Sequence, residues 1–501
     1  MSTPEPASVH DRIEHKKLDR ALVGGFAWTA GAKWISQAVS WPSVLITARL
    51  LSPSDYGLVE LAGFYFIITN VMAEFGIGMA VLQMRELDAS ITAQLNTLAA
   101  MSGALAFCLS VALAPLIAAF FRAPALHVLV IVSSLSFILT SLEAIPLGLI
   151  QRDMDYRRLS ITESVQALLT AVVSVACAYA GMGYWSLIAG NLIGRAGNIS
   201  LAVYWRPVGY KWPRFREVAG PLRYGMETAV QRVVWAINAL SDTLIIGRTM
   251  GPVPVGAYRL ASNLASTPAD KVGALIMRVT GPLFSRVQHD RELMLRYFLI
   301  FSETLAMSVF PLLIGLAIVA PETVNLLLKS KWDGAIAPLR WLAIFVPIRT
   351  LSYLVGQLLN TLRLTRFGMT MSLITFAVMP VAFYVASRWG VGAVAAAWLI
   401  MAPINTLPLF IKVCRSIHCG VLEYLNALLP AIVGSAVMLV TILLFRSRVQ
   451  THGWKGLLSE VTIGGLAYGV TLWGFYRDRV MRFVRFFASF RKRPEEAATV
   501  A

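Results

Sequence analysis

The sequence predicts an all-α integral membrane protein with about fourteen transmembrane helices, arranged as two six-helix lobes and two extra C-terminal helices. Of its 501 residues, 57% are hydrophobic and only 14% are charged, whereas soluble domains carry about 25% charged residues. Apolar runs of about 20 residues, each long enough to cross about 30 Å of hydrocarbon, recur along the whole chain. The alternating pattern of a membrane barrel strand is absent, so we expect these runs to be helices.

A repeated motif divides the chain into two similar halves. ITARLLSPSDYGLVELA, over 46–62, aligns without a gap with IIGRTMGPVPVGAYRLA, over 245–261, and places a Pro and a Gly at matching positions in both. Chance similarity between Leu- and Ala-rich helices is the alternative, and the matched Pro and Gly positions argue against it. Since each half holds an even number of helices, we expect lobes of the same orientation, related by a pseudo-twofold axis along the membrane normal.

The elements follow in order from the apolar runs and the polar segments between them. We expect these divisions: a cytoplasmic tail over 1–20, an N-lobe over 21–205, a basic connector over 206–219, a C-lobe over 220–415, two further helices within 416–476 and a basic tail over 477–501. The expected helices span 22–50, 56–83, 93–120, 125–151, 159–180, 184–205, 220–249, 254–284, 293–319, 335–361, 368–387, 391–413, 424–445 and 457–476.

Basic residues set the orientation. The net charge of +17 would indicate nucleic acid in a soluble protein, but here we assign it to the positive-inside rule. Lys and Arg are roughly three times more frequent in the loops on the side of both termini than on the opposite side. Both termini and the connector are therefore expected in the cytoplasm, with no nucleic-acid partner. The opposite loops are short, so the protein's work is expected inside the bilayer.

Charged residues within the predicted spans are the candidate functional residues, because a charge at the bilayer centre costs about 2.5–3.5 kcal/mol and tends to face a cavity. Guanidinium and ammonium groups bind phosphate oxygens, so the basic set predicts a cavity for an anionic substrate. That set is Lys33, Arg49, Arg195, Arg232, Arg259 and Lys271. Glu74 and Asp242 are candidates for ion coupling or gating.

A structural interpretation of the same charges stays open. Asp270 and Lys271 can partly neutralise each other as neighbours in the sequence, and Arg195 and Arg349 can extend toward the membrane surface.

No catalytic, metal or cofactor site is predicted. Asp153-Met154-Asp155 has the D-x-D form that holds a metal in many glycosyltransferases, but the surrounding arginines can pair with both carboxylates. The histidines are scattered, the four cysteines form no metal or disulfide pattern, and no nucleotide-binding motif is present.

These features resemble the polysaccharide transporter, or oligosaccharide flippase, branch of the superfamily that includes the multidrug and toxic-compound exporters and the lipid II flippase. The resemblance rests on TARLLSPSDYGLVELA, on AEFGIGMAVLQMREL from Ala73, on GMGYWSLIAG from Gly181, and on the segment from Val255 that contains Pro268 and PLFSR. It covers about residues 20–415.

The resemblance implies a two-lobed bundle in the bacterial inner membrane, with a cationic central cavity and alternating access. The implied partner is an oligosaccharide on undecaprenyl pyrophosphate, together with membrane lipids and a polysaccharide polymerase or chain-length complex. Arg259 and Glu74 match basic and acidic positions of the family pattern. The lipid II flippase carries several arginines in its first helix, whereas this chain has Lys33 and Arg49 there, and the helix over 368–387 lacks an acid for a sodium site of the family type.

Three alternatives remain. A drug or cation antiporter of the same superfamily would favour acids over arginines in its cavity. A membrane-embedded ligase, polymerase or glycosyltransferase would need a large outer loop or a catalytic carboxylate pair. A passive scaffold for a polysaccharide assembly complex would need no charge at mid-membrane depth.

Overall fold

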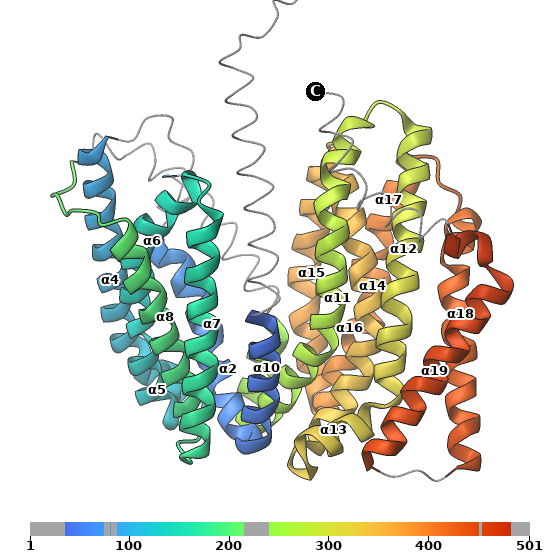
Figure 1. Ribbon diagram of the computed structural model, residues 1–501, viewed down its shortest axis with the longest axis horizontal. Coiled ribbons are helices and arrows are strands. Elements are labelled where there is room, and N and C mark those ends of the chain that lie inside the picture. The colour runs from blue at the N-terminus through green and yellow to red at the C-terminus, as the bar shows by residue number, and fades with distance from the viewer. Residues whose placement is uncertain (1–35, 75–80, 82–87, 215–239, 450–452, 482–501) are drawn as a thin grey trace, which may run out of the picture. The chain divides into compact units, whose positions relative to one another are not determined.

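The computed structural model describes residues 36–74, 81, 88–214, 240–449 and 453–481 (Figure 1). Every regular element in these ranges is a helix, which confirms the predicted all-α class. The chain divides into two compact units, Met1–Gly256 and Ala257–Ala501. Each is described by itself below.

The part of the first unit that the structure describes contains eight helices and the start of a ninth. They are a helix over 36–50, α2 (Pro53–Glu74), α4 (Ala89–Phe121), α5 (Ala125–Ser133), α6 (Leu135–Arg152), α7 (Tyr156–Tyr179), α8 (Trp185–Trp205), α10 (Ser241–Met250) and the beginning of α11 (Pro252–Arg286).

The second unit continues along α11 and ends in the two helices without a counterpart in the repeat. Its elements are α12 (Arg291–Ile318), α13 (Ala320–Leu328), η1 (Ser330–Ala335), α14 (Ile336–Thr361), α15 (Thr365–Ala386), η2 (Ser387–Trp389), α16 (Val391–Asn405), α17 (Leu407–Ser416), α18 (Val421–Arg448) and α19 (Gly453–Phe475).

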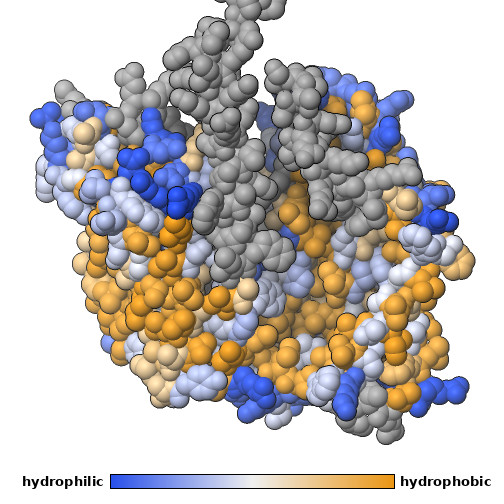
Figure 2. Space-filling model, viewed as in Figure 1, coloured by the Kyte–Doolittle hydropathy of each residue, from blue (hydrophilic) through white to orange (hydrophobic). Residues whose placement is uncertain are grey.

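Eight segments within the described ranges are long and apolar enough to cross a membrane. Figure 2 shows hydrophobic residues over the middle of the helices in each unit and hydrophilic residues gathered near their ends, the distribution of a membrane-spanning surface. The chain is therefore a multi-pass membrane protein.

Three local features differ from the sequence prediction. The helix expected over 125–151 is interrupted at Ser134, where α5 ends and α6 begins. The helix expected over 391–413 breaks at Thr406 between α16 and α17, with Pro408 in the first turn of α17, because proline cannot donate the backbone bond that a continuous helix needs. The loop expected before residue 335 contains α13 and η1.

Two glycines of α8 lie at its contact with α7 in the first unit. Gly190 and Gly194 are spaced four residues apart and lie on one face of α8. A Cβ at Gly194 would stand 2.0 Å from Oγ1 of Thr170 and 2.8 Å from the carbonyl oxygen of Gln166. These glycines therefore allow the two backbones to approach as small residues do in membrane helix pairs.

Substituting Gly194 with alanine is expected to lower stability, although alanine is the better helix former. The added methyl group meets the carbonyl oxygen of Gln166, which is part of the α7 backbone, and overpacking of this kind costs about 1–3 kcal/mol. Thermal unfolding in detergent measures the effect. Gly465→Ala in α19, where a Cβ would meet nothing within 4 Å, is the control and should equal or exceed wild type. Equal melting of both variants would refute the close α7–α8 contact.

The two copies of the repeated turn meet at their glycines. A Cβ at Gly57 would lie 1.8 Å from the carbonyl oxygen of Pro252, and one at Gly256 would lie 1.9 Å from that of Pro53. The contact is reciprocal, since each glycine sits on the proline that opens the other helix. Only a residue without a side chain fits at either position.

The two extra helices, α18 and α19, pack against each other and against α12 in the second unit. Within α18 and α19, the ring of Tyr468 covers Gly434, and the Tyr468 hydroxyl donates to the carbonyl of Met307 in α12 at 2.8 Å. Tyr424 of α18 stacks on Phe298 of α12 with ring centroids 5.5 Å apart.

Ion pairs reinforce both ends of this packing. At one end Arg446 binds Glu460 through two nitrogens, at 2.8 and 2.7 Å, and reaches Glu322 of α13 at 2.9 Å. At the other end Arg479 reaches Glu303 at 3.3 Å. These helices are thus an integral part of the second unit.

Candidate functional site

An ion pair lies at mid-depth in the first unit. Arg195, at the middle of α8, pairs with Glu143, at the middle of α6, at 3.2 Å, and also donates to Oγ1 of Thr140 at 2.5 Å. Their side chains are 23% and 12% exposed. Among the described residues, Nε of Arg195 is buried without a hydrogen-bond partner, so this donor is unsatisfied in this conformation.

A second charged cluster lies at mid-depth in the second unit. Arg349, at the middle of α14, pairs with Asp270, near the middle of α11, at 3.1 Å. The hydroxyl of Tyr353 donates to the same carboxylate at 3.4 Å. Nε of Arg349 is also buried without a partner in the part of the chain that the structure describes.

Further contacts join α11 to α14 beyond this cluster. Gly273 of α11 faces Thr350 and Tyr353 of α14, and the Thr280 hydroxyl donates to the side chain of Gln357. The two helices thus hold the Asp270–Arg349 pair in a fixed register.

The exposed fractions of the Asp270 and Arg349 side chains indicate what surrounds this second cluster. The side chains of Asp270 and Arg349 are 49% and 33% exposed, although each lies far from the ends of its helix. A charge facing lipid at the bilayer centre costs about 2.5–3.5 kcal/mol. This face of α11 and α14 therefore suits a water-filled path better than hydrocarbon.

The other basic residues predicted from the sequence fall into three groups. Lys33 and Arg232 lie outside the described residues. Arg49 is exposed at the end of the helix over 36–50, so it lies near a helix terminus and not at mid-depth. Arg259 is half-buried on α11, and Lys271 is exposed beside Asp270.

The two acidic candidates differ in setting. Glu74 is the last residue of α2, and its side chain lies outside the description. Asp242 is buried in the first turn of α10, where its Oδ1 accepts from the backbone N–H of Thr243 at 2.6 Å and from the Thr243 hydroxyl at 3.1 Å. A carboxylate at a helix N-terminus is stabilised by the peptide dipoles, which gives Asp242 a structural role besides any in coupling.

Sequence reasoning missed the partner of Asp270. The adjacent Lys271 is the neighbour along the chain, but the ion pair joins Asp270 to Arg349 on another helix. Successive residues of a helix point in directions about 100° apart, so neighbours in sequence do not face each other. The mid-helix position of both charges was the available signal.

Both carboxylates of the Asp153-Met154-Asp155 turn pair with arginine side chains, as expected from the sequence. Asp155 caps α7 by accepting from the backbone N–H of Arg158 at 3.1 Å and pairs with the Arg158 side chain. Asp153 pairs with Arg206. No group of three or more His, Cys, Asp or Glu side chains that could hold a metal occurs among the described residues.

The chain has the fold of membrane transporters whose structures are known. It superposes on the lipid II flippase MurJ in an inward closed conformation with a TM-score of 0.73, over 90% of this chain and 99% of that one, at 15% identity. An inward-facing multidrug resistance MATE family transporter gives a TM-score of 0.62 over 76% and 94% of the two chains, also at 15% identity.

Residues 46–337 match the family model described as polysaccharide biosynthesis protein, and the chain belongs to this family. The lipopolysaccharide biosynthesis protein WzxC of Escherichia coli (strain K12) is 25% identical over 407 residues, 78% of this chain and 80% of that protein. The succinoglycan biosynthesis transport protein ExoT of Rhizobium meliloti (strain 1021) is 26% identical, covering 66% of this chain and 67% of that protein. An uncharacterised membrane protein of the cps region of Klebsiella pneumoniae is 23% identical over 89% and 93%.

Proposed function

We propose that this protein is a flippase that carries undecaprenyl-pyrophosphate-linked oligosaccharide repeat units across the bacterial inner membrane. The units serve the synthesis of an exopolysaccharide, a capsule or an O-antigen. The family and the names of its relatives, which include a succinoglycan transport protein, support the pathway. The similarity to a lipid II flippase fold supports the mode of action. No covalent bond is made or broken.

The observation that carries the proposal is the charged face at mid-depth on α11 and α14. Arg349 is one-third exposed there, although its Nε–H is itself buried without a partner among the described residues. Guanidinium groups bind phosphate oxygens through parallel hydrogen bonds, so a pyrophosphate is a fitting ligand. Arg195, with the same kind of buried donor, provides a comparable group in the first unit.

The proposed topology has about fourteen spans in two six-helix lobes plus two helices, with both termini in the cytoplasm. The lobes are assigned to 21–205 and 220–415. The lipid-linked sugar enters from the cytoplasmic side while its lipid tail stays in the bilayer, the lobes rock, and release follows outside. A polymerase or chain-length complex would receive the repeat unit.

Further residues of the proposed cavity are basic and acidic side chains from the spans. We assign pyrophosphate or anionic-sugar binding to Lys33, Arg49, Arg195, Arg232, Arg259 and Lys271. Glu74 and Asp242 are assigned to ion coupling, because protonation or cation binding at a carboxylate within the membrane senses an ion gradient.

Arg232→Ala and Arg259→Ala are expected to slow the translocation of lipid-linked oligosaccharide in reconstituted vesicles. Loss of one charged hydrogen bond to phosphate removes about 1.5–3 kcal/mol, which corresponds to about 10- to 150-fold in binding. Arg291→Ala, at the exposed start of α12, is the matched control and should behave as wild type. Unchanged transport in both test variants would remove these two residues from the cavity, and a failure of the wild-type protein to move the lipid would refute the flippase itself.

A further inference from the structure

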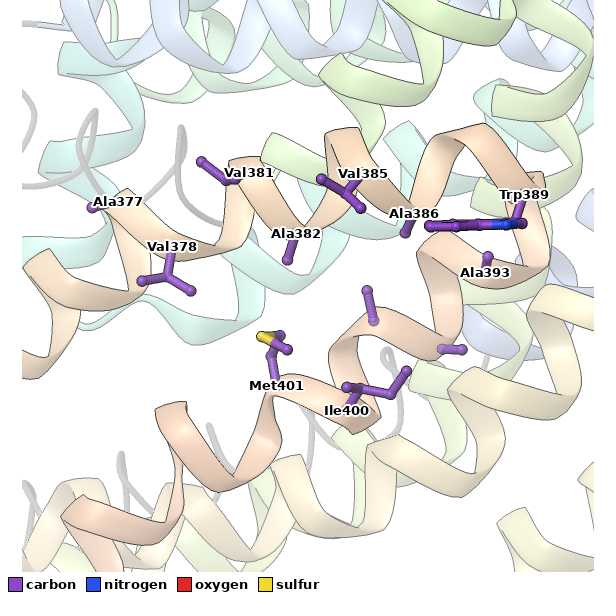
Figure 3. Close-up of a pocket in the computed structure, with 12 residues that line it drawn as sticks. Ala377, Val378, Val381, Ala382, Val385, Ala386, Trp389, Ala393, Ile400 and Met401 are labelled. Carbon is purple, nitrogen blue, oxygen red and sulfur yellow. The ribbon is translucent and has the colours of Figure 1, made fainter.

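A groove runs between α15 and α16, and none of the residues assigned to substrate lines it. Its volume is about 580 Å³, within the range of about 300–1,000 Å³ usual for small-molecule sites. The lining is apolar along both helices, and the indole nitrogen of Trp389 is the only side-chain nitrogen or oxygen among the lining residues. Figure 3 shows the ring of Trp389 lying across one end of the groove.

Small side chains create this groove. Ala382 and Ala386 lie one turn apart on α15, and Ala393 and Ala397 lie one turn apart on α16, so each pair shares a helix face. The turn at η2 joins the two helices, and Ala386 and Ala393 lie near each other beside Trp389 in Figure 3. Methyl groups leave a hollow there that larger side chains would fill.

The length of the groove matches one leaflet of the bilayer. From Ala377 to Trp389, α15 and η2 rise about 18 Å at about 1.5 Å per residue. Half of the hydrocarbon core is about 15 Å. Trp389 is 72% exposed and occupies the position of an interfacial aromatic residue, so the groove reaches from the membrane surface to about the midplane.

The groove is narrow compared with a helix. A volume of 580 Å³ spread over about 18 Å gives a mean cross-section of about 32 Å², less than half that of an α-helix about 10 Å across. A slender apolar chain therefore fits the groove better than a helix does. The exposed residues of α15 around it, including Val381 and Val385, place the groove on a surface that meets lipid.

Positive charge lies at the surface end. Arg388 is exposed next to Trp389, with its guanidinium over the ring of Tyr384 at 5.9 Å. The same turn is the N-terminus of α16, which begins at Val391 and adds the positive end of its peptide dipoles. Both features attract a phosphate at the headgroup level.

We propose that this groove binds one acyl chain of an anionic phospholipid, with the lipid phosphate against Arg388. The site is independent of the flippase assignment, because none of its lining residues belongs to the proposed cavity. A bound lipid would fill the hollow that the alanines leave and so stabilise the α15–α16 hairpin.

Photo-crosslinking in nanodiscs tests this site. The probe is phosphatidylglycerol with a diazirine in the middle of one acyl chain, and adducts are located by mass spectrometry of peptides. Wild-type protein should carry adducts on α15 and α16. Ala382→Phe and the milder Ala397→Leu should each lower the yield at least about fivefold, because filling the hollow removes contacts worth about 1 kcal/mol or more. Leu373→Phe, exposed on α15 and outside the groove, should match wild type.

The headgroup is tested with the same probe on a phosphatidylcholine. Arg388→Gln should lower the yield for phosphatidylglycerol relative to phosphatidylcholine by about fivefold, the effect of one basic residue at an anionic lipid surface. An unchanged ratio overturns the phosphate assignment. Wild-type crosslinking yields in both Ala382→Phe and Ala397→Leu overturn the groove as the binding site. Stronger labelling by a polyprenyl-phosphate probe than by phosphatidylglycerol overturns the choice of an acyl chain.

Discussion

Arg349→Gln is expected to reduce translocation of the lipid-linked substrate by about 10- to 100-fold, the change that follows from losing one charge-assisted hydrogen-bond donor to a phosphate. Arg349 lies at the middle of α14, is partly exposed, and shares its charge with Asp270. The pair stands where lipid contact would be costly, and the exposed third of the Arg349 side chain is accessible to the substrate. Initial rates in reconstituted vesicles measure the effect, with Arg366→Gln at the exposed start of α15 as the control.

Substitutions of Asp270 test whether Arg349 binds the substrate or only joins α14 to α11. Asp270→Asn removes the competing carboxylate and leaves Arg349 charged, so we expect transport within a few-fold of wild type and stronger inhibition by free pyrophosphate. The exchange Asp270→Arg with Arg349→Asp restores an ion pair but moves the guanidinium to α11. If this double variant regained wild-type transport, the pair would be structural and Arg349 would not bind the substrate.

The helix positions were predictable because apolar run length and charge decide them. The bounds of α12, α18 and α19 lie within a few residues of those expected. A span must satisfy its backbone internally and must be about 20 residues long. These two requirements leave little choice of helix bounds along an apolar run.

Breaks within a span were less predictable, because hydrophobicity does not report them. Thr406 separates α16 from α17, and the signal was Pro408 two residues later, since proline is favoured in the first turn of a helix. α13 likewise begins with Ala320-Pro321 and has Glu322 in its first turn, which is a helix-start signature inside a segment expected to be a loop. At Ser134 neither proline nor glycine marks the interruption, so packing between helices must decide it.

The candidate site was predictable in kind and less so in detail. Mid-span charges identified Arg195 and Asp270 as unusual, but their partners Glu143 and Arg349 lie on other helices. Partners across helices depend on helix rotation and depth, which a single sequence does not encode. The contact between the repeated turns is another example. The sequence shows that the two glycines align, but it does not predict that the two turns contact each other.

Alanine at Gly57 or Gly256 is expected to lower transport by about fivefold or more. Each new Cβ would stand within 2 Å of a proline carbonyl oxygen on the other copy of the turn, at 1.8 Å for Gly57 and 1.9 Å for Gly256. These oxygens belong to the first turns of α2 and α11 and cannot move without their helices, so the turns must separate. Overpacking costs about 1–3 kcal/mol, and a cycle that needs this contact in one of its states would shift its populations by about 5- to 150-fold.

The two helices supply matched controls for this prediction. A Cβ at Gly63 of α2 would meet nothing within 4 Å, and one at Gly281 of α11 would meet Gln357 at an ordinary 3.6 Å. Gly63→Ala and Gly281→Ala should therefore transport at the wild-type rate, and both should melt no lower because alanine favours the helix by about 1 kcal/mol. Because the repeat places a glycine at both sites, Gly57→Ala and Gly256→Ala should be impaired to a similar extent. Normal transport by both variants would show that the close contact of the turns is not needed in the cycle. A loss of transport in Gly57→Ala alone would show that the two glycines do not contribute equally to transport, although their contacts are reciprocal.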